Sequence, residues 1–524
     1  GQLTENLNIR ASITDQNVPF QPEGNTQQVQ DFDNILVELY NDKLSLAAGD
    51  VVLQQRKSEF LRYYKNVQGA QFTTNYMIGD KWRASTQAAA SVAKGKFASI
   101  VLEVAEGTLG PYRIQGPQNE RFVIIMANSE RVFLDGVQLQ RGFNYDYVID
   151  YNQGEITFTP KVLITQYTRI RVDFEYAERN YSRSILTANH IQESDKVSFY
   201  MNLYREQDNR NRPLFFELSD QDKSLLASVG NDVESAAVPR VDSVAFDPNR
   251  ILNRKVIDID DQGRPFEYFE YSNNPDDELY NVRFSLVGNN QGNYILVNNQ
   301  AVGKIYEYVA PIAGIPQGNY EPIVRLIAPT KIQMATILGK YNPSEKTLLD
   351  FEAAISNNDQ NLYSNLDDNN NKGFAGKFNG KQRLFDGKTK IDAFANYQLV
   401  QENFKTIERL YNIEFNRDWN IISTLLGNQS FLTSGLDFNF NNKGKAIYQF
   451  ENLAFGDAFS GNKHTFSGKY AAKNWMIWSN SSVMKSDSEL SNSSFARSEN
   501  RSSYKLGKNW VGATVNLENN SEKL

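Results

Sequence analysis

The chain has no cysteine among its 524 residues. This absence excludes disulfide bonds, zinc sites with cysteine ligands and catalysis by a thiol group. Histidine is also scarce, with only His190 and His464 in the whole chain. Neither histidine has the His-x-His or Glu-x-x-His spacing of a metal site. We therefore interpret both as surface residues.

Excess basic charge and long hydrophobic runs are missing too. The net charge is −7, and the lysine and arginine residues are spread along the chain. Nucleic-acid-binding proteins have basic patches, so nucleic acid is not an expected partner. Hydrophobic runs fall short of the ~18 residues that a membrane-spanning helix needs.

The common catalytic motifs are absent. The sequence has no Gly-x-Ser-x-Gly nucleophile elbow, no phosphate-binding loop and no Gly-x-Gly-x-x-Gly dinucleotide motif. It has 62 acidic residues, but their spacing singles out no pair suited to glycoside hydrolysis. The sequence therefore predicts a protein that is not an enzyme and has no cofactor.

Aromatic residues, by contrast, are plentiful. Phenylalanine, tyrosine and tryptophan make up 12% of a chain that is polar overall, with a mean hydropathy of −0.53. Many aromatics in a polar chain are typical of alternating strands that have one hydrophobic and one wet face. We therefore expect an all-β protein, with residues 1–48 as a flexible lead-in that holds one strand near 37–40.

The stretch 144–160, NYDYVIDYNQGEITFTP, predicts a β-hairpin around residues 152–154. Asp135-Gly136 just before it is a strong type I′ turn signal. The period of two places the side chains of one face in a core, and it continues through 169–176. We expect residues 49–188 to form a β-sandwich module. The predicted core residues of the hairpin are Tyr147, Ile149, Ile156 and Phe158.

One helix stands out in the region 189–334, which we interpret as a mixed connecting region with further strands. Residues 218–227 predict a helix that has Ser219 at its N-cap position and Asp220 and Asp222 in its first turn. Gly230 stands where a helix C-terminal glycine belongs.

Residues 335–524 alternate between hydrophobic and polar side chains in repeated runs with Asn, Gly, Lys and Asp turns between them. An example is Ile391, Ala393, Ala395, Tyr397 and Leu399, which alternate with mostly polar neighbours. Runs of this length are typical of an antiparallel transmembrane β-barrel, and a soluble antiparallel sandwich is the alternative. A run at 411–416 is among the predicted strands. Aromatics near strand ends support a girdle: Trp419, Trp475, Trp478 and Trp510.

The chain ends in the polar stretch 519–524, whereas outer-membrane barrels usually end in a strand with a terminal aromatic residue. We therefore expect the barrel to be incomplete in this chain. A carboxylate cluster, Asp258, Asp260 and Asp261, resembles part of a calcium loop but lacks the closing glutamate. We interpret this cluster as a solvated turn, with a metal site as the alternative.

Several segments resemble a family of large outer-membrane proteins of the Bacteroidota. They are EGTLGPYRIQGPQNERFVIIMANSERVFLDGVQLQRGFNYDYVIDYNQGEITFTP, LFFELSDQDKSLLASVGND and QGNYEPIVRLIAPTKIQM, which lie between residues 49 and 334. The resemblance implies an N-terminal β-sandwich module, a C-terminal β-barrel and an outer-membrane location. The family's role is poorly defined. In such bacteria Asp242-Ser243-Val244 fits an O-glycosylation site at Ser243.

The expected function is that of a non-enzymatic outer-membrane component of a protein assembly, secretion or transport complex. Its partners would be outer-membrane lipid and other outer-membrane or periplasmic proteins, which an exposed strand edge can bind by β-augmentation. The alternative is a surface protein for glycan binding or adhesion, since tyrosine and tryptophan can stack on sugars. We expect the N-terminal domain to lie in the periplasm.

Overall fold

The computed structural model places most of the chain in β-strands. The structure describes residues 1–524 except 5, 16–32, 94, 117–124, 127, 152, 166–167, 177–180, 215–216, 260–262, 301–302, 422–424, 426, 489–491 and 524. The chain divides into two compact units. The first comprises residues 1–215, 331–359 and 368–524, and the second, called here the inserted unit, comprises residues 216–330 and 360–367.

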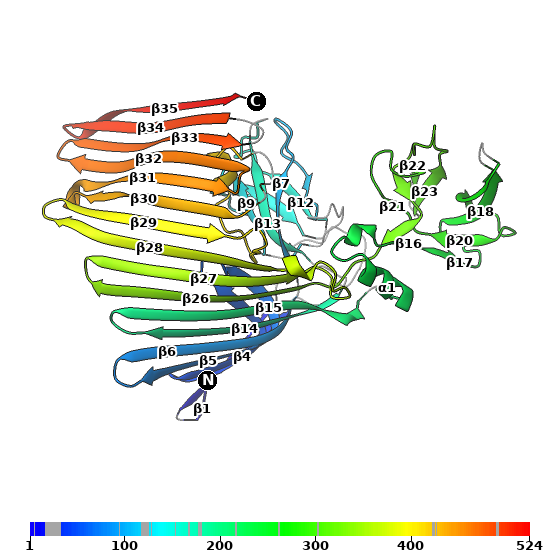
Figure 1. The fold of residues 1–524 in the computed structure, drawn as a ribbon, viewed down its shortest axis with the longest axis horizontal. Coiled ribbons are helices and arrows are strands. Elements are labelled where there is room, and N and C mark those ends of the chain that lie inside the picture. Colours follow the sequence, from blue (N-terminus) through cyan, green and yellow to red (C-terminus); the bar gives the residue numbers. More distant parts are fainter. Residues whose placement is uncertain are drawn as a thin grey trace. The chain divides into compact units, whose positions relative to one another are not determined.

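The first unit is built on an antiparallel sheet of 18 strands, which lie side by side in Figure 1. In spatial order, with each strand paired to the next, they are β1 (Gln2–Thr4), β2 (Leu7–Asp15), β3 (Asp33–Tyr40), β4 (Leu44–Gln55), β5 (Tyr63–Ile78), β6 (Trp82–Ala93), β14 (Tyr181–Glu193), β15 (Val197–Pro213), β26 (Lys331–Ser344), β27 (Thr347–Asp359), β28 (Lys372–Asp386), β29 (Lys390–Val400), β30 (Gln429–Asn439), β31 (Gly444–Phe455), β32 (Phe459–Ala472), β33 (Trp475–Ser488), β34 (Asn492–Leu506) and β35 (Asn509–Lys523).

This sheet is not closed into a barrel. Within the described part of the chain β1 pairs with β2 alone and β35 pairs with β34 alone, so the first and last strands do not meet. Of the expected incomplete barrel, the structure shows a large antiparallel sheet that is open. Barrel closure requires pairing between distant strands, and a strand's own alternation does not specify that pairing.

The sheet also draws on far more of the chain than the sequence predicted. Strands from residues 1–93 and 181–213 belong to the same sheet as the strands after residue 331. The sequence placed those earlier residues in a lead-in, a sandwich module and a connecting region. The strand near residues 37–40 is present as β3, and the alanine-rich stretch at 82–92 is strand β6.

The two ends of the sheet differ in their connections. At one end, on the left in Figure 1, short segments of two to four residues join neighbouring strands. These are residues 41–43, 79–81, 194–196, 345–346, 387–389, 440–443, 473–474 and 507–508. The opposite end carries the longer connections, which include residues 94–180, 214–330, 360–371 and 401–428, together with the shorter connections 56–62, 456–458 and 489–491. The loop 401–428 contains the one-turn helix α2 (Phe415–Asp418).

A small β domain, residues 96–176, forms part of the first unit. One sheet has the strand order β10-β9-β13-β7 and the other β11-β12-β8. The strands are β7 (Lys96–Leu102), β8 (Tyr112–Arg113), β9 (Arg131–Leu134), β10 (Val137–Gln138), β11 (Tyr147–Asp150), β12 (Glu155–Phe158) and β13 (Ile170–Tyr176). The two sheets share one hydrophobic core, to which β13 contributes Val172 and Phe174 and β12 contributes Ile156 and Phe158.

The predicted hairpin of this domain is confirmed. Strands β11 and β12 pair with Tyr147 opposite Phe158 and Ile149 opposite Ile156. Three of these side chains are buried, and Ile149 packs partly buried against the same core. The preceding turn is also confirmed, because Asp135 and Gly136 both have positive φ, as a type I′ turn requires.

The inserted unit has helix α1 (Asp220–Ser228) and three small sheets. Ser219 is the N-cap, and it forms a capping box with Asp222, as the sequence predicted. Gly230 has a φ of +62° just beyond the helix. The strands are β16 (Ala237–Pro239), β17 (Val241–Ser243), β18 (Leu252–Ile259), β19 (Pro265–Ser272), β20 (Leu279–Val282), β21 (Ser285–Leu286), β22 (Tyr294–Gln300), β23 (Gly303–Tyr308), β24 (Tyr320–Glu321) and β25 (Ile323–Arg325).

None of the helices in the described residues combines the length and hydrophobicity needed to cross a membrane.

Candidate functional site

The two faces of the large sheet have different neighbours. The inner face, defined here as the face with Lys65 and Gln398, is covered in part by the small β domain and by loop segments. Residues 58–61 and 404–421 contribute hydrophobic side chains that pack on this face near the long-connection end. The opposite, outer face has no such cover within the described chain. The inner face is therefore the side on which a site can be enclosed.

A buried ion pair joins the small β domain to the inner face. The amino group of Lys65 on β5 lies 3.3 Å from the carboxylate of Glu175 on β13. Only 3% of the lysine side chain and 8% of the glutamate side chain are exposed. Burial raises the pKa of Glu175 above its usual value, although Lys65 counteracts part of this effect. On strands β14 and β15 of the same sheet, the Arg183 guanidinium lies 2.6 Å from Asp208 and 3.4 Å from Glu206.

The loop between β29 and β30 adds further ionic contacts to the small β domain. Arg409 forms an ion pair with the buried Asp173 of β13. Arg169 lies 2.9 Å from Glu414, and Arg131 lies 3.9 Å from Glu408. The polar face of β13 is thus buried against the sheet and this loop. We call the set Lys65, Glu175, Asp173, Arg409, Arg169 and Glu414 the charged seam.

A cavity of about 610 Å³ lies along the charged seam. Its lining includes Arg56, Arg62, Asp173, Glu408 and Arg409. Paired charges of this kind hold a domain in a defined position, since a misplaced domain would leave a buried charge without its partner. The arrangement is suited to positioning the small β domain across the inner face.

A second network lies inside the small β domain, and the sequence analysis did not single it out. The buried carboxylate of Glu130 accepts hydrogen bonds from the hydroxyls of Tyr151 (3.0 Å) and Tyr147 (3.3 Å). Arg141 donates to the same carboxylate at 3.1 Å. Burial raises the pKa of Tyr151 to about 12. All four residues stand in the segment that carries the family resemblance, so the signal was present but had no recognisable catalytic spacing.

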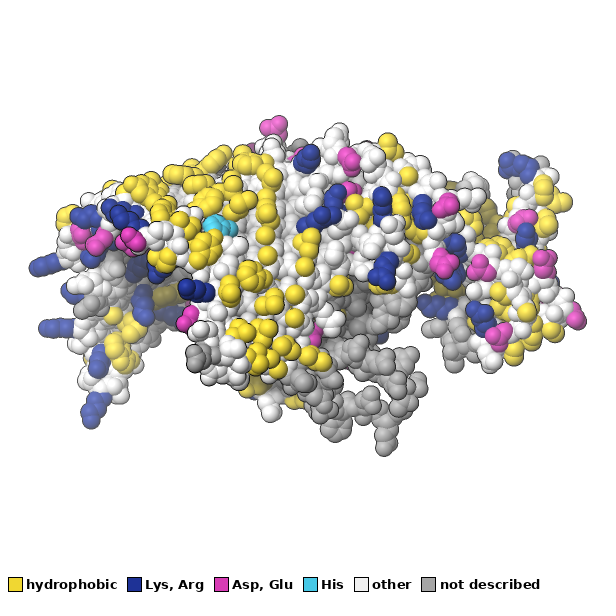
Figure 2. Space-filling view, turned by 90° about the horizontal axis from the view of Figure 1, so that it is seen from below, with side chains coloured by type: hydrophobic (Ala, Val, Ile, Leu, Met, Phe, Trp, Pro, Cys, Tyr) yellow, Lys and Arg dark blue, Asp and Glu magenta, His cyan; other side chains and the backbone are white. Residues whose placement is uncertain are grey.

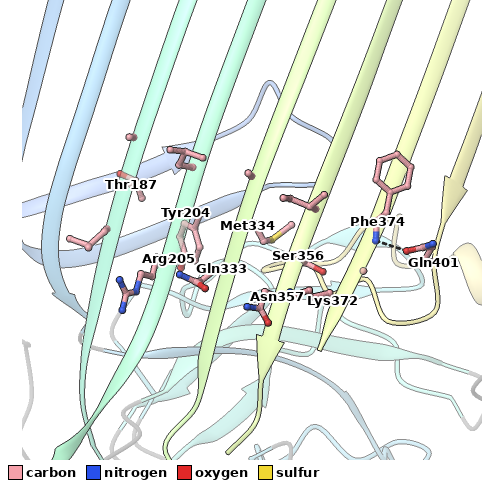
Figure 3. Close-up of a pocket in the computed structure, with 16 residues that line it drawn as sticks. Thr187, Tyr204, Arg205, Gln333, Met334, Ser356, Asn357, Lys372, Phe374 and Gln401 are labelled. Carbon is pink, nitrogen blue, oxygen red and sulfur yellow. Dashed lines mark hydrogen bonds between the residues drawn. The ribbon is translucent and has the colours of Figure 1, made fainter. Parts of the chain in front are cut away.

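The outer face has a hollow of about 830 Å³ near the long-connection end. Its lining comes from β14, β15, β26, β27 and β28, together with Gln401, whose side-chain oxygen accepts a hydrogen bond from the Phe374 N–H at 2.9 Å. In Figure 3 the polar residues Arg205, Gln333, Asn357 and Lys372 lie in one row, and Phe374 lies above Lys372.

The predicted metal-site residues are only partly described. Asp258 is exposed on the β18–β19 hairpin, opposite Phe266, whereas Asp260 and Asp261 lie outside the described residues. In the parts of the chain that are described, no three acidic or histidine side chains are grouped so as to hold a metal ion. The calcium site stays a prediction. Ser243 is exposed at the end of β17, so the O-glycosylation site also stays a prediction.

Each histidine lies at hydrogen-bond distance from a hydroxyl group on the outer face. His190 Nδ1 lies 2.9 Å from the Thr86 hydroxyl, and His464 Nδ1 lies 2.9 Å from the Tyr448 hydroxyl. The tryptophan girdle is corrected in part. Trp475 is exposed on the outer face, but Trp419 is 1% exposed in the hydrophobic cluster on the inner face. Trp478 and Trp510 alternate onto the inner face as well.

Comparison with known families gives one match. A family model described as a domain of unknown function, DUF8818, matches residues 97–178, which are nearly the whole of the small β domain. No curated protein matches the chain. The match defines the small β domain as a recurring module whose boundaries coincide with those of the structure.

Proposed function

We propose that the chain forms the membrane-embedded wall of a non-enzymatic outer-membrane β-barrel protein. This protein would be a component of an outer-membrane protein assembly, secretion or transport complex, as the sequence resemblance to Bacteroidota proteins implies. Barrel closure would require further strands that pair with the free edges of β1 and β35.

The observation that carries this proposal is the distribution of polar and hydrophobic residues over the sheet. On β29 the buried Asp392 and Gln398 point to the inner face, while the exposed Ala395 and Tyr397 point outward. On β27 Glu352 is buried and Phe351 is exposed. A sheet in water places its hydrophobic face under cover. Exposed hydrophobic residues opposite a polar, covered face fit strands that have lipid on the outside.

The lengths and ends of the strands support the same proposal. The strands after residue 331 have 11–15 residues, so each reaches the roughly 9–11 that a tilted transmembrane strand needs. Eight short connections at one end contain a lysine, namely Lys43, Lys81, Lys196, Lys346, Lys388, Lys443, Lys473 and Lys508. Basic side chains gather at this end in Figure 2. Charged turns of this kind would remain in the aqueous phase beside the membrane.

The connections also bear on orientation. In outer-membrane barrels the short turns face the periplasm and the longer loops face the outside. By this rule the small β domain, which belongs to a long connection, would lie at the extracellular end. This proposal is the opposite of the periplasmic placement expected from the sequence, and protease digestion of intact cells distinguishes the two. Cleavage within residues 96–176 in intact cells supports the extracellular side.

The charged seam suggests a role for the small β domain. The small β domain covers part of the inner face, which would line a lumen, and ion pairs attach the domain to the sheet and to the loop 401–428. Such a domain would act as a plug or as a docking module for partner proteins. Its free strand edges are suited to β-augmentation by a partner chain.

Spin labels test the membrane proposal. A label at Ala395 on the outer face and a label at Asn480 on the inner face both replace exposed residues. In proteoliposomes the Ala395 label should be accessible to oxygen in the bilayer and shielded from a water-soluble nickel reagent. The Asn480 label should be accessible to nickel. The proposal fails if nickel reaches both labels equally.

The alternative, glycan binding, is favoured by a cavity in the inserted unit. The cavity has a volume of about 350 Å³, and Asn253, Asn281 and Lys304 line it together with Phe284 and Tyr306. The rings of Phe284 and Tyr306 stack at 4.5 Å. The amide groups can form hydrogen bonds to the hydroxyls of a sugar, and an aromatic ring can stack on its face. A glycan array with Tyr306→Ala as the control variant tests this function, and equal glycan binding by both proteins argues against this cavity.

A further inference from the structure

The hollow on the outer face combines two successive rows of side chains with different character. Because the strand pairings align residues across the sheet, each row can be read directly from the register. The hydrophobic row is Ala188, Leu203, Ala335, Ile355 and Phe374. The next row toward the long-connection end is Leu186, Arg205, Gln333, Asn357 and Lys372.

The change from hydrophobic to polar is therefore abrupt. Residues two apart in a strand are separated by about 7 Å, so this is the distance between the two rows. Arg205 and Lys372 lie three strand spacings apart, which is about 14 Å between their backbones. Figure 3 shows both cations at the polar side of the hollow. The hollow thus has a hydrophobic wall and a polar margin with a cation at each side.

The charge of the hollow is entirely positive. Its lining contains Arg205 and Lys372 and no acidic residue. The Arg205 guanidinium donates a hydrogen bond to the Gln207 side chain at 3.1 Å. Within the described chain neither Arg205 nor Lys372 has a carboxylate at ion-pair distance. In the next row toward the long-connection end, by contrast, Lys331 forms an ion pair with Asp359 at 3.1 Å.

We propose that this hollow is a binding site for an anionic phospholipid. Its acyl chains would lie on Leu203, Ile355 and Phe374, and its phosphate would contact Arg205 or Lys372. A free phosphate ion would leave the hydrophobic row unused, and a neutral lipid would leave both cations without a counter-charge. Charge complementarity therefore favours an amphiphile with a negative headgroup over a partner protein.

The site rests on the proposed function, because a lipid reaches the outer face only if that face is in a bilayer. It goes beyond the proposed function by naming one lipid class and one location. Each lysine or arginine near an anionic membrane surface contributes about a factor of five to binding. Two such cations predict that anionic lipid is retained roughly 25-fold better than when both are neutralised.

Native mass spectrometry of the full chain tests this site. The protein is reconstituted in nanodiscs of phosphatidylcholine with added phosphatidylglycerol, then released and examined for retained lipid. Arg205→Gln/Lys372→Gln should lose the retained phosphatidylglycerol. The matched control, Lys388→Gln/Lys508→Gln, removes the same charge from the short turns and should retain the lipid as the native protein does.

A second pair of variants changes no charge. Ala335→Trp should fill the hollow and reduce lipid retention, whereas Ala395→Trp, on the outer face of β29, should not. The inference is overturned if phosphatidylcholine is retained equally, if inorganic phosphate displaces the lipid, or if a partner protein occupies the hollow instead. Insertion into nanodiscs without selective retention refutes this site alone. Failure to insert refutes the proposed function as well.

Discussion

At the scale of single residues, the acidic side chains of β13 alternate as predicted, but they are buried rather than exposed to water. The alternation of 169–176 correctly separates Val172 and Phe174 from Asp173 and Glu175. A polar face normally indicates contact with water. Here it is buried, because the sheet and the loop 401–421 bring basic partners to it. The sequence alone could not identify Lys65 or Arg409 as those partners.

The ion pair between Lys65 and Glu175 gives the first prediction. Lys65→Met should lower the free energy of unfolding by about 3–5 kcal/mol, because it leaves a buried carboxylate without its partner. The double variant Lys65→Met/Glu175→Leu should recover most of this loss. Urea denaturation of the full chain measures both effects. Lys57→Met is the control, since Lys57 and Glu193 form a more exposed pair and should change stability by about 1 kcal/mol or less.

The pH dependence of stability gives a second prediction. Burial raises the pKa of Glu175 above 4.5, so the folded protein holds this proton at a pH where the unfolded chain has released it. Stability should therefore fall as the pH rises from 4.5 through the raised pKa, and then level off. Glu175→Gln should remove this part of the slope. An identical pH profile for the native protein and the variant would show that Glu175 does not titrate in this range.

At the scale of elements, local signals were reliable where the element is stabilised locally. The capping box of α1 and the positive φ of Asp135 and Gly136 depend on neighbours in sequence. The prediction of a strand at 411–416 was wrong, because these residues form no strand in the structure. Tyr411 and Phe415 instead stack at 4.0 Å in a loop that packs on the inner face. The alternation at 411–416 fits a strand, but the packing of this loop on the sheet determines its conformation.

The N-cap of α1 gives the third prediction. The Ser219 side chain accepts a hydrogen bond from the Asp222 N–H at 3.1 Å. Ser219→Ala should cost about 1 kcal/mol and increase hydrogen exchange of the first-turn amides. Ser224→Ala is the matched control, because this exposed serine lies inside the same helix, where alanine is the better helix former. Equal exchange in both variants would argue against the cap.

At the scale of the whole molecule, the sheet collects strands from nearly the entire chain. Hairpins account for most neighbouring pairs, but β6 pairs with β14 and β15 pairs with β26 across long insertions. The insertions fold with cores of their own, which include Ile156 in the small β domain and Leu226 in the inserted unit. This separation of cores predicts separable unfolding events.

Calorimetry of the full chain tests that separation. Leu226→Ala should lower the melting temperature of one transition, since emptying a fully buried leucine site costs about 2–5 kcal/mol. Ile156→Ala should lower a different transition and leave the first in place. A single transition that shifts equally in both variants would mean that the two units unfold together.

The sequence by itself determined that the protein is all-β, that its strands alternate, and where the hairpin and the main helix lie. These features depend on side-chain period, turn chemistry and capping, which act over a few residues. Only the tertiary structure decided which strands share the large sheet, that the sheet stays open, and that the polar face of β13 is buried. These outcomes depend on contacts between residues hundreds of positions apart. A strand's own pattern states which face is polar, but the partner that covers that face is supplied by the rest of the fold.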